Sequence, residues 1–349
     1  MEKKRIAVEA TGADGNYEQV RIGTAEAIKK DAGLDVFLVA GKDKLKEQGY
    51  LNDQGELIDE AIPEGMDRDH IILTETTYHY PNKDTHDTSS IYRALDMHKA
   101  KEVDAVVAPG DTYPTVTRSF ELFARHDRIG KVRPAIAVDF SGNVLIDAGA
   151  NKDCKPKYYY QFAIMGSVIA RYKLGIKNPL VGVVTNGSEH WKGDDIAQAS
   201  IPFLNRLRDK GYNISQEFFE PYTLRDPNGK GFRKGLVLVT DGLMGNIILK
   251  TSETMFGISG DLTRVAYSEE PLVSRLIGGP TLRRIGRRIK EKVDPKSFGA
   301  APLYGFDANI LVAHGSSDAK AIESAILNTR NYLDYNLNER LKEELARIS

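Results

Sequence analysis

The segment DAGANKDCKPKYYYQFAIMGSVIARYKLG, residues 147–175, carries the pattern that decides the fold class. Its first residues are small or polar and close an apolar run, Val144–Asp147, and the chain then takes helical spacing over Lys157–Leu174. A short β-branched run, a small polar loop and a helix together make one β–α unit. Because similar units recur along the chain, the sequence favours an α/β fold with a mainly parallel sheet.

The rest of the chain repeats this alternation of strand and helix. The first helix illustrates the criterion, since Val20, Ala27 and Ile28 lie on one apolar face before DAGLD ends it. The expected strands are Arg5–Glu9, Asp35–Ala40, His70–Thr74, Asp104–Ala108, Ala135–Asp139, Val144–Asp147, Leu180–Val184, Leu236–Thr240 and Ile310–Ala313. The expected helices are Tyr17–Asp31, Ser89–Lys101, Val116–His126, Lys157–Leu174, Asp194–Lys210, Gly245–Phe256 and Asp318–Ile348. No internal repeat or linker separates them, so we expect a single domain over residues 1–349.

Composition excludes several classes of protein. The chain has 349 residues, a formal net charge of −1 and one cysteine. The near-neutral charge gives no global field for nucleic acid, and one cysteine cannot form an internal disulfide. No apolar run reaches the roughly 20 residues that span a bilayer, and no apolar signal region precedes the first strand. We therefore expect a cytoplasmic, soluble protein.

One segment departs from the β–α pattern and predicts a helical arm at about residues 256–297. It contains EEPLVSRLIGGPTLRRIGRRIKEKVDP, which is basic, amphipathic and interrupted by Gly278, Gly279 and Pro280. One interpretation is an arm that contacts a partner chain. The other is a peripheral membrane contact, in which apolar side chains enter the interface between basic ones. The residues concerned are Leu272, Leu276, Ile277, Arg283 and Arg284.

Six expected strands end in small or polar clusters, which we expect to share one edge of the sheet. The clusters are EATGADG (9–15), APGDTYP (108–114), DAGAN (147–151), TNGSEHWKG (185–193), TDGLMGN (240–246) and AHGSSDAKA (313–321). Glycine amides and helix N-termini at such an edge can bind an anion, although the same residues are also ordinary turn and cap formers. Nucleotide fingerprints and metal-ligand spacings are missing from the sequence, so we expect no cofactor and no metal. Cys154 is expected to be a small buried residue rather than a nucleophile.

Five motifs, taken in order along the chain, resemble one family. DAGANKDCKP…QFAIMGS, the KG after a Gly-Ser-Glu turn, DGLMGNIILKTSE, FGAAPLYG and AHGSSDAKAI look like the acyl-ACP:phosphate acyltransferase family, PlsX, over nearly the whole chain. The resemblance implies a three-layer α/β/α sandwich related to phosphate acetyltransferases, and a homodimer. It also implies transfer of a fatty acyl group from acyl carrier protein to inorganic phosphate, giving acyl phosphate for phospholipid synthesis.

The resemblance and the strand ends together name the candidate site residues. For catalysis we select Lys192 for charge stabilisation, His190 for proton transfer to the departing thiolate and Asn246 as a donor, although such side chains in a turn can also be simply solvated. Asp147 is expected to order its loop, because a carboxylate facing phosphate would repel it. The other candidates for binding phosphate or substrate are Gly12, Asp14, Gly110, Asp111, Thr112, Gly149, Asn151, Gly187, Glu189, Asp241, Gly242, Gly245, His314, Ser316 and Ser317. The last three are equally consistent with a helix cap.

The chain departs from the family pattern at the same strand ends. Glu9 stands where the family has Asp, Asp111 and Tyr113 replace residues of a Gly-Asn-Thr-Gly loop, and Thr185 opens the turn that usually reads Asn-Ile-Gly-Glu-Glu. A carboxylate beside phosphate costs roughly a kcal/mol unless it is paired. Three hypotheses follow: the family reaction, a paralogue that uses a short-chain or non-ACP acyl substrate, and a non-catalytic scaffold that binds an acyl carrier. A dehydrogenase is a weaker fourth, because the cofactor fingerprint is missing.

Overall fold

The computed structural model describes residues 3–12, 17–77, 88–110, 112–125, 132–189, 191–229, 231–293 and 299–348. Three candidate site residues lie outside these ranges: Asp14, Asp111 and His190. The described part also excludes the side chains of Leu272, Leu276 and Ile277.

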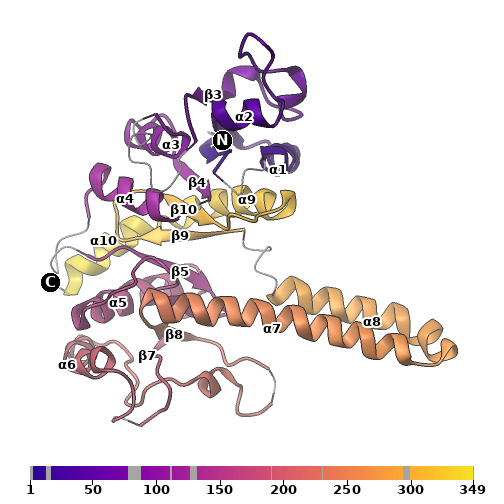
Figure 1. Cartoon of the computed structure of the whole chain (residues 1–349). Coiled ribbons are helices and arrows are strands. Elements are labelled where there is room, and N and C mark those ends of the chain that lie inside the picture. Colours follow the sequence, from indigo (N-terminus) through magenta and orange to yellow (C-terminus); the bar gives the residue numbers. More distant parts are fainter. Residues whose placement is uncertain are drawn as a thin grey trace.

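Ten strands in the described residues form one sheet (Figure 1). They are β1 (Lys4–Glu9), β2 (Leu34–Gly41), β3 (Ile71–Thr74), β4 (Ala105–Pro109), β5 (Ala135–Asp139), β6 (Val144–Ile146), β7 (Leu180–Val183), β8 (Leu236–Val239), β9 (Ala300–Tyr304) and β10 (Ile310–Ala313). Their order across the sheet is β3-β2-β1-β4-β10-β9-β5-β6-β8-β7. The predicted strands are all present to within a few residues, and β9 is the one that the sequence pattern missed.

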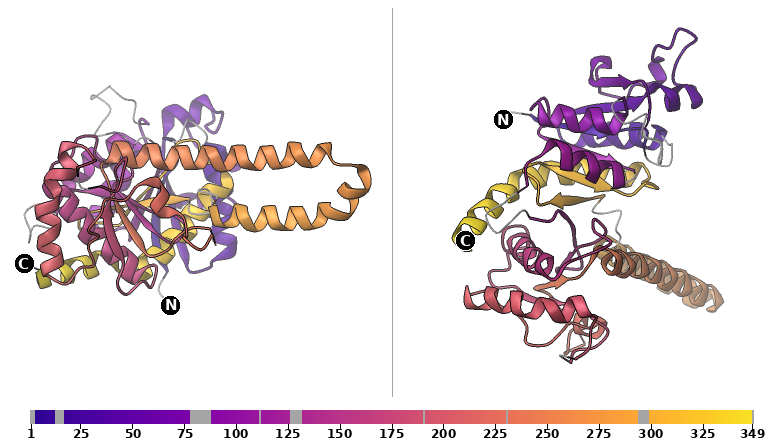
Figure 2. Two further views of the ribbon diagram at one scale, coloured as in Figure 1. Left: turned by 90° about the horizontal axis from the view of Figure 1, so that it is seen from below. Right: turned by 60° about the vertical axis from the view of Figure 1, so that its left-hand side comes forward.

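Helices cover both faces of this sheet, which confirms the three-layer α/β/α fold (Figure 2). They are α1 (Tyr17–Lys30), α2 (Lys42–Glu47), α3 (Ser90–Lys99), α4 (Thr112–Leu122), α5 (Pro156–Tyr172), α6 (Asp195–Asp209), α7 (Gly242–Glu269), α8 (Leu272–Val293), α9 (Ala319–Tyr335) and α10 (Leu337–Ile348), with 3₁₀ turns at Asp59–Ala61, Arg68–His70 and Pro221–Leu224. In one half of the sheet, α1 and α9 share a core with one face, and α3 packs on the other. In the other half, α5, α6 and α10 share one core, and α7 covers the opposite face.

The two halves of the sheet run in opposite directions. Strands β1, β2, β3, β4 and β10 are mutually parallel, whereas β9 is antiparallel to both β10 and β5, and β6 is antiparallel to β5. Strands β7 and β8 then follow the direction of β6. The expectation that all six polar clusters share one edge is therefore wrong: three follow β1, β4 and β10 at one edge, and three follow β6, β7 and β8 at the other. We call these edges the first rim and the second rim.

A tight hairpin between β5 and β6 produces this reversal. Ser141 and Gly142 have φ values of 54° and 84°, and Phe140 and Asn143 exchange backbone hydrogen bonds of 2.7 and 3.1 Å. Two successive left-handed residues form the hairpin turn whose twist suits antiparallel strands. The sequence FSGN thus reverses the direction of every later strand up to β8.

The opening segment folds as expected, and Gly166 explains how. A Cβ on Gly166 would lie 2.3 Å from Cγ1 of Val237, so only glycine lets α5 pack this closely on β8. The Ser167 hydroxyl donates to the Ala163 carbonyl at 2.7 Å, which allows a buried serine inside the helix. The last predicted helix, in contrast, is two helices, because Asn336 adopts a left-handed φ of 49° between α9 and α10.

Helices α7 and α8 pair as a hairpin that projects from the sheet (Figures 1 and 2). They overlap the predicted arm, but α8 continues through Gly278, Gly279 and Pro280 instead of breaking there. Helix α7 also begins three residues before the predicted start and is 28 residues long. No helix in the described part of the chain is long and apolar enough to cross a membrane. That the chain forms a single domain stays a prediction.

Candidate functional site

At the second rim, Asp147 organises the loop that follows β6. Its Oδ1 accepts from the backbone N–H of Ile136, Gly149 and Ala150 at 3.0–3.2 Å. Its Oδ2 accepts from the backbone and the side-chain amide of Asn151 at 2.8 and 2.6 Å. Burial raises the pKa of this carboxyl, and the donors oppose that shift. With its acceptors occupied by protein donors, Asp147 holds the loop, as expected from the sequence.

Asn151 has no hydrogen left for a ligand. Its Nδ2 donates to the carbonyl of Pro134 and to Asp147, both at 2.6 Å, and its Oδ1 accepts from Nε of Arg133. The side chain is also buried. The prediction that Asn151 donates to phosphate therefore has no geometric support, because the amide already binds within the loop.

The N-terminus of α7 packs onto this loop. Asp241 caps the helix by accepting from the Met244 N–H at 2.8 Å, and the Gly242 N–H donates to the Asn151 carbonyl at 2.8 Å. A Cβ on Gly245 would lie 1.8 Å from the carbonyl oxygen of Asp147. These three predicted binding residues thus serve close packing. Only Asn246 remains exposed, and its amide has no hydrogen-bond partner among the described residues.

Lys192 lies after the outermost strand of this half, β7. It forms an ion pair with Glu189 at 3.2 Å, and both side chains are about two-fifths exposed. A hydrogen bond from the backbone of Glu189 itself lowers the pKa of the Glu189 carboxyl, and Lys192 lowers it further. Within the described chain this pair lies away from the cavity described below, so the structure does not bring Lys192 together with Asn246 around one void.

At the first rim, Glu9 has the role that Asp147 has at the second. It is buried and accepts from the Gly12 N–H at 2.8 Å, the Thr11 N–H at 3.0 Å and the Ser90 hydroxyl at 2.6 Å. Burial raises its pKa, against the effect of these donors. A Cβ on Gly110 would lie 2.9 Å from the Gly12 carbonyl, so the loops after β1 and β4 touch through their glycines.

His314 completes the first rim, after β10. Its Nδ1 accepts from the Ser316 N–H at 3.1 Å and lies 2.7 Å from the Ser316 hydroxyl. The neutral ring therefore carries its proton on Nε2. The Ser317 hydroxyl donates to the His314 carbonyl at 2.6 Å, and Asp318, not either serine, caps α9. The two serines thus order His314, which is exposed and whose Nε2 has no hydrogen-bond partner among the described residues.

A cavity of about 650 Å³ connects Asn246 to the first rim. Its floor is the apolar face of β5 and β9 with Val312, and its side wall is α7, through Leu249 and Phe256. Its polar lining at the rim includes Gly12, Gly110, Thr112 and His314. A lining that combines apolar side chains with polar groups suits a small amphipathic ligand, and the volume is in the usual range for ligand sites.

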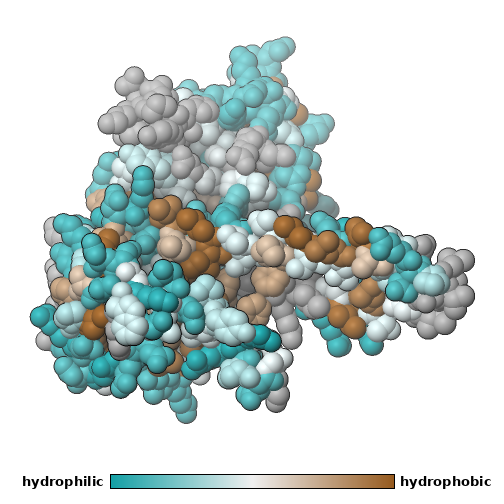
Figure 3. Space-filling model, turned by 60° about the horizontal axis from the view of Figure 1, so that its bottom comes forward, coloured by the Kyte–Doolittle hydropathy of each residue, from teal (hydrophilic) through white to brown (hydrophobic). Residues whose placement is uncertain are grey.

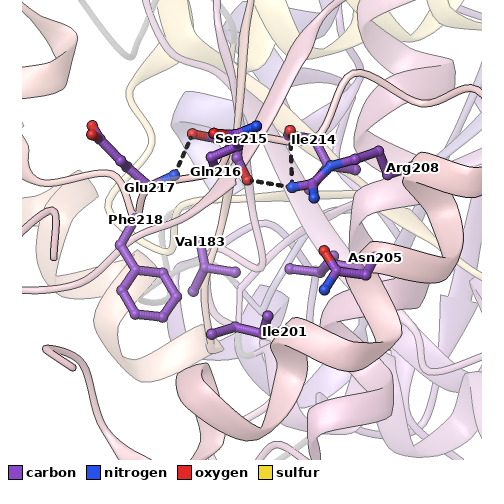
Figure 4. Close-up of a pocket in the computed structure, with 10 residues that line it drawn as sticks. Val183, Ile201, Asn205, Arg208, Ile214, Ser215, Gln216, Glu217 and Phe218 are labelled. Carbon is purple, nitrogen blue, oxygen red and sulfur yellow. Dashed lines mark hydrogen bonds between the residues drawn. The ribbon is translucent and has the colours of Figure 1, made fainter. Parts of the chain in front are cut away.

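A second hollow, of about 250 Å³, lies between α6 and the residues after Ile214 (Figure 4). Its one guanidinium, that of Arg208, already donates to the carbonyls of Ile214 and Ser215 at 3.4 and 3.2 Å. The Glu217 N–H donates to the Ser215 hydroxyl at 3.2 Å. The protein itself uses these polar groups, so the cavity at the first rim is the stronger candidate site.

Comparison with known proteins gives the family. The family model described as fatty acid synthesis protein matches residues 4–340. A phosphate acyltransferase from Campylobacter concisus is 31% identical over 99% of both chains, and one from Geobacter sulfurreducens is 33% identical over 98% of this chain and 94% of its own. The chain belongs to this family, PlsX.

Solved structures support the fold. A phosphotransacetylase from Streptococcus pyogenes superposes with a TM-score of 0.53 at 12% identity, covering 95% of this chain and 94% of its own. A branched-chain phosphotransacylase from Enterococcus faecalis gives 0.52 at 9% identity, with 98% coverage of both chains. At such identities the likeness shows the shared fold alone.

Those departures of this PlsX-family chain that lie in the described residues do not block the cavity. Glu9 turns back on its own loop, as described above, and the Thr185 hydroxyl donates to the Gly187 carbonyl at 2.6 Å within its turn. Tyr113 is 52% exposed and lies outside the cavity lining. Cys154 is buried, and burial raises the pKa of its thiol to about 12, which fits the expected inert residue.

Sequence reasoning missed four charged residues that line the cavity of this PlsX-family chain: Asp139, Lys173, Lys250 and Glu253. They lie at the end of β5, just past α5 and on the inner side of α7. No local motif marks them, because they come from separate elements that the fold brings to one cavity. A charged residue at an expected strand end, Asp139, was the one available signal.

Proposed function

We propose that this protein is a phosphate acyltransferase that moves an acyl group from the thioester of an acyl carrier to inorganic phosphate. The observation that supports the proposal most is the cavity, found in a chain of the PlsX family. Its apolar floor suits an acyl chain, and the polar first rim suits the phosphate. The acyl phosphate product would feed phospholipid synthesis.

The proposed reaction needs a bound phosphate and a polarised carbonyl. A phosphate oxygen attacks the thioester carbon, a C–O bond forms, the C–S bond breaks, and the carrier leaves as a thiolate that takes up a proton. Asn246 and His314 both line the cavity, and the Asn246 amide and the Nε2–H of His314 can donate to the developing oxyanion. Lys192 stays a proposed contributor, at the second rim.

We further propose that the active form is a homodimer that assembles through α7. Exposed apolar side chains recur on α7 at spacings of three or four residues, and Figure 3 shows apolar surface along the arm. Such spacing is typical of a helix that packs against another helix. The residues are Met255, Ile258, Leu262 and Val265. A second copy of the chain, in the cytoplasm, is the proposed occupant. Peripheral membrane contact near Arg283 and Arg284, which are exposed, is a further part of the proposal.

The test is a phosphate-dependent assay with the full chain. Acyl thioesters of acyl carrier protein and of CoA, of short and of long chain length, are incubated with phosphate, and acyl phosphate is trapped with hydroxylamine as the hydroxamate. We expect product from long-chain acyl carrier protein. Product only from short-chain or CoA thioesters would favour the paralogue hypothesis, and no product from any thioester would contradict the proposed activity.

Asn246→Ala provides the site-specific arm of this test. Loss of one oxyanion donor lowers kcat by roughly 10²–10³. Asn205→Ala is the matched control, because Asn205 is an exposed asparagine on α6 outside the cavity. Equal activity of the two variants would remove Asn246 from the mechanism.

A further inference from the structure

Lys173 has no role among the site residues that the family resemblance implies. It follows the last turn of α5, is partly buried and lines the cavity together with Asp139. Asp139 ends β5 three residues after Ile136, and Ala300 begins β9 three residues before Leu303, the partner of Ile136. Ala300 in turn pairs with Ala313, the residue before His314. The register therefore puts Asp139, whose charge acts on Lys173, at the same end of the cavity as His314.

The charges of the cavity single out Lys173. Among the described residues of the lining, the permanent cations are Lys173 and Lys250. Lys250 is paired with Glu253 at 3.0 Å. Lys173 forms no ion pair within 4.0 Å with any described residue, and Asp139 acts on it only at longer range. Burial lowers the pKa of Lys173, which Asp139 partly opposes.

A partly dehydrated ammonium without a counter-ion is costly, and a bound anion offsets that cost. The neighbouring groups suit the same anion. The N-terminal end of α4 reaches the cavity at Thr112, and a helix N-terminus favours negative charge. The Nε2–H of His314 adds a neutral donor at the same rim.

We propose that Lys173 binds a phosphate oxygen and is the cation that holds inorganic phosphate in this cavity. The inference rests on the proposed acyl transfer to phosphate, and it adds a residue and an electrostatic balance to it. Asp139 weakens the same site by like charge. Lysine acts here as a point charge, so arginine can replace part of its effect.

The experiment compares four variants of the full chain: Lys173→Met, Lys173→Arg, Asp139→Asn and Lys177→Met. The last is the matched control, since Lys177 is an exposed lysine outside the cavity. Asp139→Asn keeps the Oδ1 that accepts from the Gly142 N–H at 2.9 Å. Each variant is measured for phosphate KM, thioester KM and kcat, and for direct binding of inorganic phosphate by calorimetry, with Tm to verify folding.

We expect Lys173→Met to raise the KM and Kd for phosphate at least tenfold. Lys173→Arg should raise these two constants much less than Lys173→Met does. Asp139→Asn should lower both constants two- to fivefold. The thioester KM and the control stay within twofold. An unchanged KM and Kd for phosphate in folded Lys173→Met would overturn the inference. A rise confined to the thioester KM would also overturn it, because Lys173 would then bind a phosphate group of the acyl carrier and not inorganic phosphate. If no variant or wild type turns over, Lys173-dependent phosphate binding still supports the inference while the proposed activity fails.

Discussion

Glu9 and Asp147 have the same role at opposite edges of one sheet, yet their loops have different surroundings. Each is a buried carboxylate directly after a strand or at its last residue, and each accepts from the backbone N–H groups of its own loop. The Asp147 loop is covered by α7, which approaches it through Gly242 and Gly245. The Glu9 loop touches Gly110 of the neighbouring loop and stays open to the cavity.

The difference teaches that a polar strand end is not by itself a binding site. At the second rim the donors of the loop are used within the protein, so its residues serve stability. At the first rim the ring of His314 and the cavity remain accessible, so its residues can serve binding. Asn246 belongs to the second rim by sequence but lines the cavity of the first.

Gly245→Ala gives the largest expected effect, because it forces the second rim apart. The new Cβ would lie 1.8 Å from the Asp147 carbonyl oxygen, a backbone atom that cannot move aside. We expect a loss of at least about 3 kcal/mol in the free energy of unfolding. Gly257→Ala is the control on the same helix, where nothing lies within 4 Å, and helix propensity should stabilise it by up to about 1 kcal/mol. Denaturant unfolding that shows similar stability for both variants would contradict the tight packing of this rim.

Asp147→Asn and Glu9→Gln compare the two carboxylates directly. In either orientation of the asparagine, the new amide nitrogen at position 147 meets at least two N–H donors, because both oxygens of Asp147 accept. At Glu9, the Gly12 N–H is the one donor to Oε2 among the described residues, so a glutamine can put its nitrogen there and keep the other contacts.

We therefore expect Asp147→Asn to lose about 3 kcal/mol and Glu9→Gln about 1 kcal/mol in the free energy of unfolding. Urea unfolding at neutral pH measures both. A larger loss for Glu9→Gln would mean that the first rim, not the second, is the more tightly bound structure.

The sequence predicted the β–α units well and the relation between them poorly. Strand positions follow from short β-branched runs, and Asp147 was correctly expected to order its loop. The direction of half the sheet depended on Ser141 and Gly142, two residues that resemble any polar turn until their left-handed conformation is known. Strand β9 lies in AAPLY, which is too short and too rich in alanine and proline to stand out. Lys173 and Asp139 line the same cavity although they come from different elements, so no local pattern could pair them.

The pH dependence of the free energy of unfolding tests the half of the sheet that carries the first rim. His98 of α3 is partly buried; its Nδ1 donates to the Val103 carbonyl at 3.0 Å and its Nε2 accepts from the Asn309 N–H at 2.9 Å. Burial lowers its pKa below 6.5, against the Val103 contact. As the pH falls, the unfolded chain therefore binds a proton at His98 before the folded chain does. The stability that neutral His98 contributes is complete above about pH 6.5 and is lost as the pH falls below that value.

The titration of His98 can lower the free energy of unfolding by at most about 1.4 kcal/mol per pH unit. The free energy of unfolding of wild type and His98→Gln, measured from mildly alkaline to mildly acidic pH, isolates it, because the variant lacks the titrating ring. Parallel curves for the two proteins would show that His98 does not cause the acid sensitivity of this half.

The smallest effect is expected at the open rim itself. Ser316→Ala removes the hydroxyl 2.7 Å from Nδ1 of His314 but keeps the backbone N–H that binds the same atom. One hydrogen bond of about 1 kcal/mol corresponds to roughly a fivefold fall in turnover if His314 donates to the oxyanion. Stability should hardly change, because this loop is exposed. Ser317→Ala is the matched control, since among the described residues its hydroxyl donates to the backbone carbonyl of His314 and not to the ring. A fall in stability without a fall in turnover would show that the His314 loop has a structural role, like the loops of the second rim. The distinction between an open first rim and a packed second rim would then fail at His314, the residue on which the proposed site depends.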